Sequence, residues 1–236
     1  MKKQNVDYFK IQSCLNKSNP NKIPLILLMT GSFNPIHKMH LEIYNIAANH
    51  IKSYYKDFDI LCGLISPSYD GYVKYKHPPL IPFETRVHLI ECAIKEHKCD
   101  FPILIHKWEG TRNKFYDFPE VTDYIQKEMN NKLNNKIKVL YICGMDHYLK
   151  CQYELQSNVI VVDRKPYSSD VLMKDDIRNL IFFCKDENSK PYSSSEIKEL
   201  LKKNDKESKK KIYEITYPSV ADYIINWYSH LDQNQE

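Results

Sequence analysis

Short apolar runs alternate along the chain with longer stretches in which apolar residues recur every three or four positions. The short runs are rich in Ile, Leu and Val and apolar throughout, which is typical of strands buried on both faces. The longer stretches have the spacing of amphipathic helices. The predicted strands are 24–29, 60–65, 103–106, 138–142, 159–162 and 180–183, and the predicted helices are 39–55, 83–97, 119–133, 146–153, 194–203 and 219–230.

Strands that alternate with helices in this way predict an α/β fold with a doubly wound, parallel, Rossmann-like sheet, whose ligands bind at the carboxyl ends of the strands. A length of 236 residues is enough for one large domain. We expect a single domain over 1–236, with the polar residues 1–22 as an extension beyond the core. Two long connections, 66–82 and 204–217, carry no predicted element, and long loops often cover substrate sites.

The first strand leads directly into Thr30-Gly31-Ser32-Phe33-Asn34-Pro35-Ile36-His37-Lys38-Met39-His40 and then into a helix. A strand, a small-residue turn and a helix start form a phosphate-binding corner, because turn N–H groups and the helix dipole point at an anion there. Gly31, Ser32 and Phe33 make the turn, and His37 and His40 can reach the anion. The alternatives are a capped helix with two surface histidines, or a zinc pair that lacks a third ligand in zincin spacing.

The pattern G-S-F-N-P-x-H-x-x-H resembles the signature of the HxGH-type nucleotidyltransferases. It is similar to the version found in the eukaryotic nicotinamide/nicotinate mononucleotide adenylyltransferases. The chain shares Met39-His40 with that version but has His37 where those enzymes commonly carry threonine. Both side chains can donate a hydrogen bond to phosphate.

Further segments resemble this family in the same order along the chain. They are S-P-x-x-D-x-Y-x-K at 66–74, L-I-P-x-x-x-R at 80–86, W-E at 108–109, C-G-x-D at 143–146, V-x-R at 162–164 and a serine-rich helix start at 192–198. Each later motif is weak alone, but their common order is specific, and the resemblance extends over nearly the whole chain, from about Leu25 to Leu231.

The resemblance assigns roles to residues in these segments. It implies that Lys74 contacts the phosphate of the mononucleotide, and that Gly144 and Asp146 line the nucleotide pocket. Arg164 is implied as a further phosphate or substrate contact. Without the resemblance, Lys74 is a mobile surface lysine and Asp146 is a helix cap.

Two further roles are implied where the chain departs from the family. Phe115 would stack on the nicotinamide ring, while Phe118 stands where the family has a threonine near the carboxamide. Alternatively, both phenylalanines belong to the core face of the next helix. Ser193, Ser194, Ser195 and Lys198 would hold the ATP phosphates. Lys198 replaces an arginine, which keeps the charge but loses bidentate geometry.

The resemblance implies transfer of an adenylyl group from ATP to nicotinamide or nicotinate mononucleotide, which gives NAD or its acid form and pyrophosphate. His40, helped by His37 and Lys198, would stabilise charge on the phosphoryl groups. Mg²⁺ would travel on the ATP phosphates, and no protein metal ligands are expected. Two alternatives stay open: a related nucleotidyltransferase with another phosphorylated acceptor, and a nucleotide-binding or chaperone module with little catalysis.

Composition adds limits on location and partners. The net charge of +4 is mild, so the lysines at 202–203 and 209–211 suit a solvated loop better than a nucleic-acid patch. No apolar run approaches the ~20 residues of a membrane span, and no signal peptide is expected. Seven cysteines without a C-x-x-C pair suit reduced thiols in the cytoplasm or nucleus. Small nucleotides are the expected partners, with a homo-oligomer left open.

Overall fold

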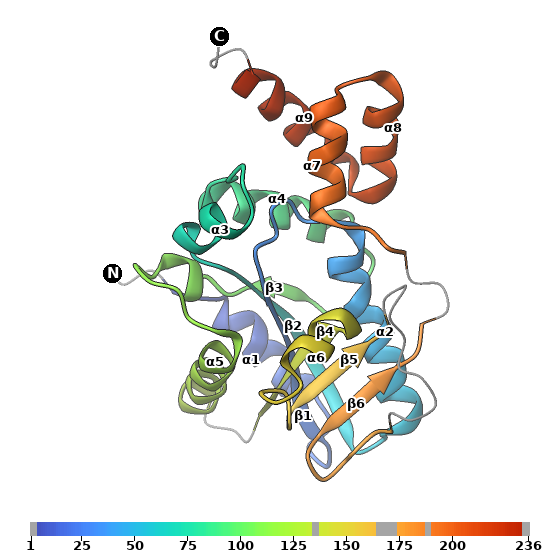
Figure 1. Cartoon of the computed structure of the whole chain (residues 1–236). Coiled ribbons are helices and arrows are strands. Elements are labelled where there is room, and N and C mark those ends of the chain that lie inside the picture. The colour runs from blue at the N-terminus through green and yellow to red at the C-terminus, as the bar shows by residue number, and fades with distance from the viewer. Residues whose placement is uncertain (1–3, 134–136, 164–173, 187–189, 233–236) are drawn as a thin grey trace.

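The computed structural model describes residues 4–133, 137–163, 174–186 and 190–232. Its centre is a six-stranded sheet in the order β3-β2-β1-β4-β5-β6, and all neighbouring strands run parallel. The strands are β1 (Ile23–Gly31), β2 (Phe58–Pro67), β3 (Ile103–Ile105), β4 (Lys138–Gly144), β5 (Val159–Val162) and β6 (Ile181–Cys184). This order confirms the predicted α/β, doubly wound, parallel sheet, and each of the predicted strands is present (Figure 1).

Helices cover both faces of the sheet. One face packs against α1 (Tyr8–Lys17), α5 (Phe118–Leu133) and α6 (Met145–Cys151), and the other against α2 (Lys38–Tyr54) and α4 (Phe83–Glu96). Two short elements, α3 (Asp70–Lys76) and the 3₁₀ turn η1 (Glu109–Thr111), follow β2 and β3. The helices α7 (Ser194–Lys203), α8 (Lys206–Ile215) and α9 (Pro218–Asp232) pack together at the end of the molecule where α4 also lies (Figure 1).

The central strand β1 is buried on both faces because its side chains point alternately to opposite sides. Leu25 and Leu27 join the core cluster that contains α2 and α4. Ile26 and Leu28 join the cluster that contains α1 and α5. The uninterrupted apolar run of this strand thus reflects two cores, one on each face.

The N-terminal residues differ from the expected polar extension. Asp7 caps α1 by accepting a hydrogen bond from the Lys10 N–H at 3.0 Å. Ile11 and Leu15, one helical turn apart, are buried in the core beside α5. The helix α1 therefore packs on the folded core through a short apolar stripe, which lies among polar neighbours in the sequence.

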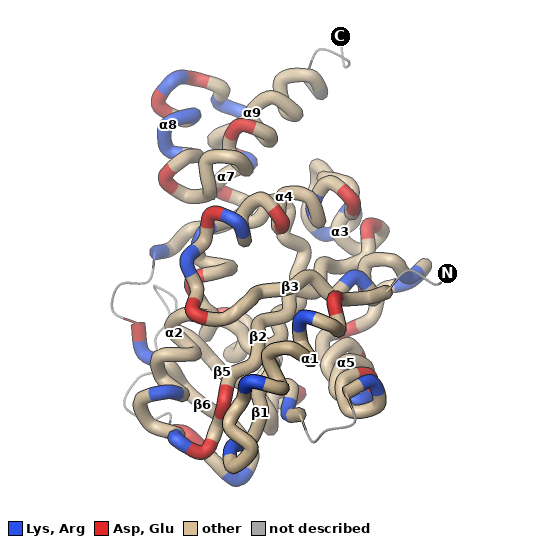
Figure 2. Tube along the Cα trace, turned by 180° about the vertical axis from the view of Figure 1, so that it is seen from behind, with Lys and Arg blue, Asp and Glu red and all other residues tan. Residues whose placement is uncertain are grey.

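The two long connections also contain helices that the sequence pattern did not predict. The first holds α3, and the second holds α8. Asp205 caps α8 by accepting from the Ser208 N–H at 2.7 Å, and Ile212 and Ile215 are buried beneath it. Lysines and acidic residues are interspersed along this helix (Figure 2). The lysines at 209–211 therefore lie in a helix and not in the solvated loop that was expected.

Two further observations concern the cysteines and the apolar helices. None of the seven cysteines is joined in a disulfide. Among the helices within the described ranges, none is both long and apolar enough to cross a bilayer.

Candidate active site

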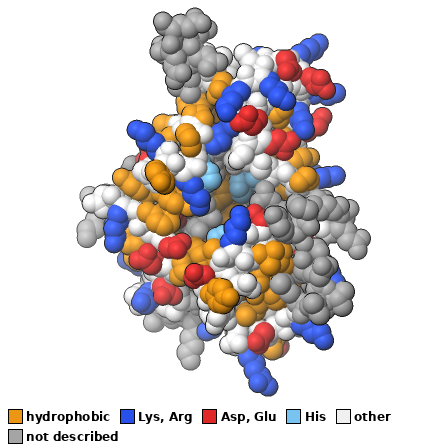
Figure 3. Space-filling view, viewed as in Figure 1, with side chains coloured by type: hydrophobic (Ala, Val, Ile, Leu, Met, Phe, Trp, Pro, Cys, Tyr) orange, Lys and Arg blue, Asp and Glu red, His pale blue; other side chains and the backbone are white. Residues whose placement is uncertain are grey.

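A cavity of about 390 Å³ opens at the carboxyl ends of β1 and β4, the two central strands. The chain leaves these strands towards opposite sides of the sheet, which is the point where doubly wound sheets bind their ligands. Side chains from β1, the start of α2, the loop before α5, the start of α6 and the start of α7 line the cavity. Figure 3 shows histidine side chains gathered in this hollow.

Two stacked histidines stand at the start of α2. Their ring centroids are 3.6 Å apart, with an angle of 24° between the ring planes. The backbone N–H of His37 donates to Nδ1 of His40 at 3.1 Å. Because Nδ1 is an acceptor, a neutral His40 ring carries its proton on Nε2. Phe33 packs edge-on against His40 with centroids 5.0 Å apart, so this ring is held from two sides.

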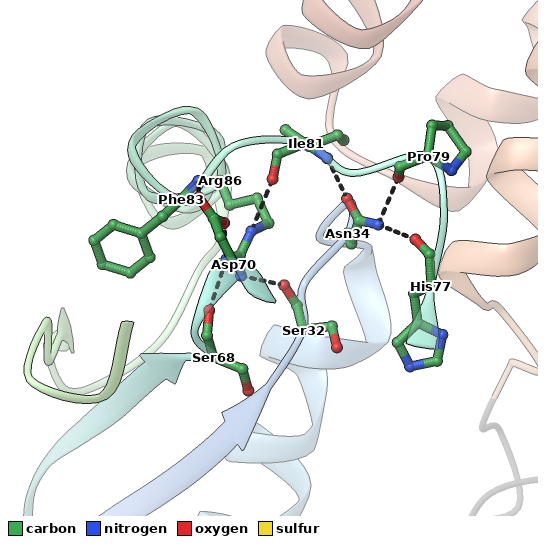
Figure 4. Close-up of polar contacts among 9 residues, drawn as sticks. All are labelled: Ser32, Asn34, Ser68, Asp70, His77, Pro79, Ile81, Phe83 and Arg86. Atoms are coloured by element: carbon green, nitrogen blue, oxygen red, sulfur yellow. Dashed lines mark hydrogen bonds and ion pairs between the residues drawn. The ribbon is translucent and has the colours of Figure 1, made fainter. Parts of the chain in front are cut away.

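A buried arginine fixes the turn that precedes these histidines. Arg86, on α4, donates from Nη1 to the carbonyl of Ser32 at 2.6 Å and from Nη2 to the carbonyl of Ser68 at 2.6 Å. It also pairs with Asp70 at 2.8 Å, and its Nε donates to the carbonyl of Ile81 at 2.9 Å. The planar guanidinium therefore ties the loops after β1 and β2 together (Figure 4).

A buried asparagine makes the second set of ties. Nδ2 of Asn34 donates to the carbonyls of His77 and Pro79 at 2.7 and 2.9 Å, and its Oδ1 accepts from the Ile81 N–H at 2.9 Å (Figure 4). The side chain is 1% exposed, so a residue without both donor and acceptor would leave buried main-chain groups unpaired. The asparagine of the signature thus positions the turn rather than the substrate.

The C-terminal helices hold the same turn from the other side. Ser194 donates to the carbonyl of Pro35 at 2.7 Å, and Thr216 donates to the carbonyl of Ile36 at 2.8 Å. Nζ of Lys38 in turn donates to the carbonyls of Tyr213 and Glu214, at 2.9 and 2.8 Å, where α8 ends. A cation suits that place because the helix dipole is negative there.

Glu109 is a buried carboxyl group on the cavity wall. It is 2% exposed, and Ser66 donates to its Oε2 at 2.8 Å. Burial raises the pKa of Glu109 to about 7, against the opposing effects of hydrogen bonds from Ser68 and Ser66 and of the Arg86 charge. At neutral pH this group is therefore divided between its neutral and charged forms.

Lys198 lies on the cavity wall near the two histidines. Its Nζ donates to the carbonyls of His77 and Pro78 at 3.1 and 3.2 Å. Burial, with a smaller effect of nearby Lys202, lowers the pKa of Lys198. The ammonium group is thus within the cavity lining but bonded to main-chain oxygens of the loop after α3.

The predicted contact at Lys74 is not found in the cavity. Lys74 is exposed and is absent from the cavity wall, whereas Lys76 is part of that wall. Nζ of Lys76 donates to the Tyr72 hydroxyl at 2.5 Å. The reason is the helix α3: residues 72 and 76 are one turn apart and share a face, while residue 74 points elsewhere.

Aromatic rings form one flank of the cavity. Phe115 stacks on Tyr72, with centroids 4.1 Å apart and an angle of 17°, and Phe118 stacks on Tyr141 at 4.9 Å and 21°. Phe115 lies in the loop before α5 and is 41% exposed, so it does not belong to a helical core face. Phe118 begins α5 and is buried, so this ring serves both the core and the cavity wall.

Most of the predicted site residues come together on the cavity wall: Gly31, Ser32, Phe33, His37, His40, Phe115, Gly144, Asp146, Ser194, Ser195 and Lys198. Ser193 is not on the wall; it caps α7 by accepting from the Glu196 N–H at 3.1 Å. Arg164 lies outside the described residues. Among residues within the described ranges, no cluster of three or more His, Cys, Asp or Glu is arranged to hold a metal ion.

Sequence reasoning did not place several residues of the wall. They include Lys76, His77, Glu109, Asp117 and His147. A signal was present for two of them: Glu109 belongs to the W-E pair, and His147 follows directly after Asp146. For His77 and Lys76 the signal depended on recognising α3 as a helix.

A profile of the cytidylyltransferase-like family matches residues 28–200, from the end of β1 into α7. The chain belongs to the cytidylyltransferase-like family. The matched region contains the corner after β1 and the motifs that follow it, up to the serine-rich start of α7. The curated relatives that match this chain confirm its predicted resemblance to the nicotinamide/nicotinate mononucleotide adenylyltransferases.

Three of these relatives are named nicotinamide/nicotinic acid mononucleotide adenylyltransferases. The Saccharomyces cerevisiae protein 1 is 30% identical over 48% of this chain and 27% of its own length. The Arabidopsis thaliana protein is 28% identical over 53% and 51%, and the Bos taurus protein 1 is 31% identical over 47% and 37%. The matched part therefore spans about half of these relatives' length or less.

A solved structure shares the fold. The Plasmodium falciparum nicotinic acid mononucleotide adenylyltransferase, complexed with NaAD, superposes with a TM-score of 0.63 and 17% sequence identity. The superposition covers 87% of this chain and 98% of that one. The likeness extends beyond the region of detectable sequence similarity and includes most of the sheet and helices described above.

Proposed function

We propose that this chain transfers the adenylyl group of ATP to nicotinamide or nicotinate mononucleotide, forming NAD or its acid form and pyrophosphate. The observation that carries the proposal is the stacked pair His37 and His40 at the start of α2, in a cavity at the switch point of the sheet. The names of the curated relatives support the same chemistry.

The reaction needs no nucleophilic side chain. A phosphate oxygen of the mononucleotide attacks the α-phosphorus of ATP, a new P–O bond forms, and the bond from the α-phosphorus to the bridging oxygen breaks as pyrophosphate leaves. The protein has to align these groups and stabilise the charge that develops. The N–H groups at the start of α2, its dipole and the Nε2–H of His40 are directed to that task.

The remaining roles follow from position on the cavity wall. Lys76, in place of Lys74, is the candidate contact for the mononucleotide phosphate, because Lys76 lines the cavity and Lys74 does not. Ser194, Ser195 and Lys198 lie at the start of α7, where they can hold the triphosphate of ATP. Lys198 would exchange its bonds to main-chain carbonyls for bonds to phosphate. Mg²⁺ would enter as part of the substrate, on the phosphates.

The test is chromatographic detection of the dinucleotide formed from Mg·ATP and each mononucleotide. His40→Ala should lower kcat by about a hundredfold or more, the usual effect of removing one transition-state donor. His88→Ala is the matched control, since His88 is an exposed histidine of α4 outside the cavity. Equal rates in His40→Ala and His88→Ala would contradict the role given to His40.

One observation favours a second candidate, a nucleotide-binding module with little turnover. The ammonium of Lys198 is bonded to the carbonyls of His77 and Pro78. If this bonding persists with ATP present, the triphosphate loses its main cation from α7. Calorimetric binding of ATP without release of pyrophosphate, for any phosphorylated acceptor in a panel, would support the module. Pyrophosphate release with a different acceptor would instead indicate a related transferase.

A further inference from the structure

The aromatic flank of the cavity is also its acidic flank. Tyr72, Phe115 and Phe118 contribute rings there, and Glu109 and Asp117 contribute carboxyl groups. A pyridine ring joined to ribose through its nitrogen carries a positive charge. Aromatic faces and carboxylates both attract such a cation. Under the proposed function, the pyridine ring of the mononucleotide therefore belongs on this flank, and the phosphates belong beside His37 and His40.

Two carboxylates occupy N–H groups at the start of α5 on this flank. Helix starts ordinarily offer unpaired N–H groups to an anion. Here the N–H of Asp117 donates to Oε2 of Glu120 at 3.1 Å, and the N–H of Phe118 donates to Oδ1 of Asp117 at 2.8 Å. The next residue, Pro119, has no N–H. The N–H groups of Asp117 and Phe118 are thus taken by two carboxylates.

The other titratable groups of the flank do not reverse the negative charge that the carboxylates give it. Burial raises the pKa of Glu109 to about 7, so it is partly ionised at neutral pH. Burial lowers the pKa of His147, which keeps that ring neutral despite the opposing effects of Asp146 and Asp117. Two lysines lie on the cavity wall: Lys76, whose Nζ donates to Tyr72 at this flank, and Lys198, whose Nζ donates to the carbonyls of His77 and Pro78.

We propose that Asp117 makes this site select the amide mononucleotide over the acid one. The inference rests on the proposed function. The carboxylate of Asp117 would accept a hydrogen bond from the carboxamide NH₂ of the amide substrate, whereas it would repel the carboxylate of the acid substrate. Asp117 is in this sense a specificity-determining residue of the cavity wall.

The experiment compares kcat/KM for nicotinamide mononucleotide with kcat/KM for nicotinate mononucleotide, at saturating Mg·ATP. The wild-type chain should favour the amide by about tenfold or more, and Asp117→Asn should reduce the ratio by about tenfold, the scale of one nearby surface charge. Asparagine caps helices as well as aspartate does, so this variant removes the charge and keeps the cap.

Two more variants make the outcome decisive. Asp123→Asn removes an exposed carboxylate of the same helix that is away from the cavity, and it should leave the ratio unchanged. Glu120→Gln, which neutralises the second capping carboxylate, should shift the ratio in the same direction as Asp117→Asn, by a smaller factor.

Different results would overturn the selectivity for the amide and the adenylyl transfer itself. If both dinucleotides form at equal kcat/KM, or if Asp117→Asn and Asp123→Asn give the same ratio, the selectivity is overturned and the adenylyl transfer stands. If neither mononucleotide yields a dinucleotide, the adenylyl transfer itself is overturned, and the role of Asp117 falls with it.

Discussion

Glu109 shows how a single buried carboxyl group links the cavity to the stability of the fold. Burial raises its pKa from an ordinary 4.5 to about 7. Between these two values the folded chain keeps the proton while the unfolded chain loses it. Unfolding therefore releases a proton in this range, and the stability that this group contributes falls as the pH rises from about 4.5 to about 7.

We predict that replacing Glu109 by Gln removes this pH dependence, because glutamine keeps an acceptor for Ser66 but does not ionise. The free energy of unfolding of the wild type, relative to Glu109→Gln, should fall by about 2.5 kcal/mol between pH 5 and pH 8. Urea unfolding at several pH values measures the difference. Glu84→Gln, at an exposed position of α4, should track the wild type. A constant difference between wild type and Glu109→Gln would contradict the assignment.

At the scale of elements, α1 illustrates what a short apolar stripe contributes. Ile11 is 0% exposed against α5, whereas Phe9, on the same helix, is 81% exposed. The two residues thus offer a large core deletion and a larger surface deletion within one helix.

We predict that Ile11→Ala destabilises the protein by about 2–5 kcal/mol, the usual range for emptying a fully buried aliphatic site. Phe9→Ala should change the free energy of unfolding by less than about 0.5 kcal/mol, although it removes more atoms. Denaturant unfolding of both variants tests the point. Equal effects would mean that α1 does not pack on the sheet as described.

The helices and strands differ in how well they could be predicted from the sequence. The longer helices have strong periodicity because each buries an apolar face against the sheet, and the strands are apolar throughout because both of their faces are buried. The helices α1, α3 and α8 bury only one or two apolar side chains each, among them Val73 in α3 and Ile212 in α8. Such a weak pattern is outweighed by the lysines and tyrosines around it. Their helical structure comes from packing and caps, which the linear pattern does not reveal.

The unpredicted helix α3 determines which lysine lies on the cavity wall. The resemblance of residues 66–74 to the family motif placed Lys74 at the phosphate. With the helix, the turn spacing places Lys76 beside Tyr72 on the cavity side. The residues of the signature turn were predictable because their neighbours in sequence are also their neighbours in space. Arg86 and Glu109 act across the chain, so their positions required the assembled fold.

At the scale of the whole molecule, the signature turn lies between the sheet and the C-terminal helices. On the sheet side it is held by Arg86 and Asn34. On the helix side it is held by Ser194, Thr216 and Lys38. The sheet thus supplies the cavity floor, while α7 and α8 fix the backbone that carries His37 and His40. The binding of ATP that we propose at the serines of α7 would therefore be mechanically connected to the alignment of the histidines.

Thr216 provides the sharpest test of this connection, because it is fully buried and its hydroxyl donates to the carbonyl of Ile36, next to His37. Thr216→Val keeps the volume but leaves that carbonyl without its donor, which should cost about 1–3 kcal/mol of stability. We further predict a loss in kcat of about tenfold or more with a smaller change in KM for ATP, because misplaced histidines weaken the transition state more than substrate binding. Steady-state kinetics and urea unfolding measure the two effects.

The matched control is Thr216→Ser, which restores the hydroxyl and loses the methyl group. It should recover most of kcat even though it leaves a small gap in the core. Should Thr216→Val and Thr216→Ser lose stability equally and retain full kcat, the bond to Ile36 would be structural only, and alignment of the histidines would depend on the other contacts of the turn. A kcat that follows the hydroxyl rather than the stability would instead establish that α8 takes part in positioning the phosphate-binding corner.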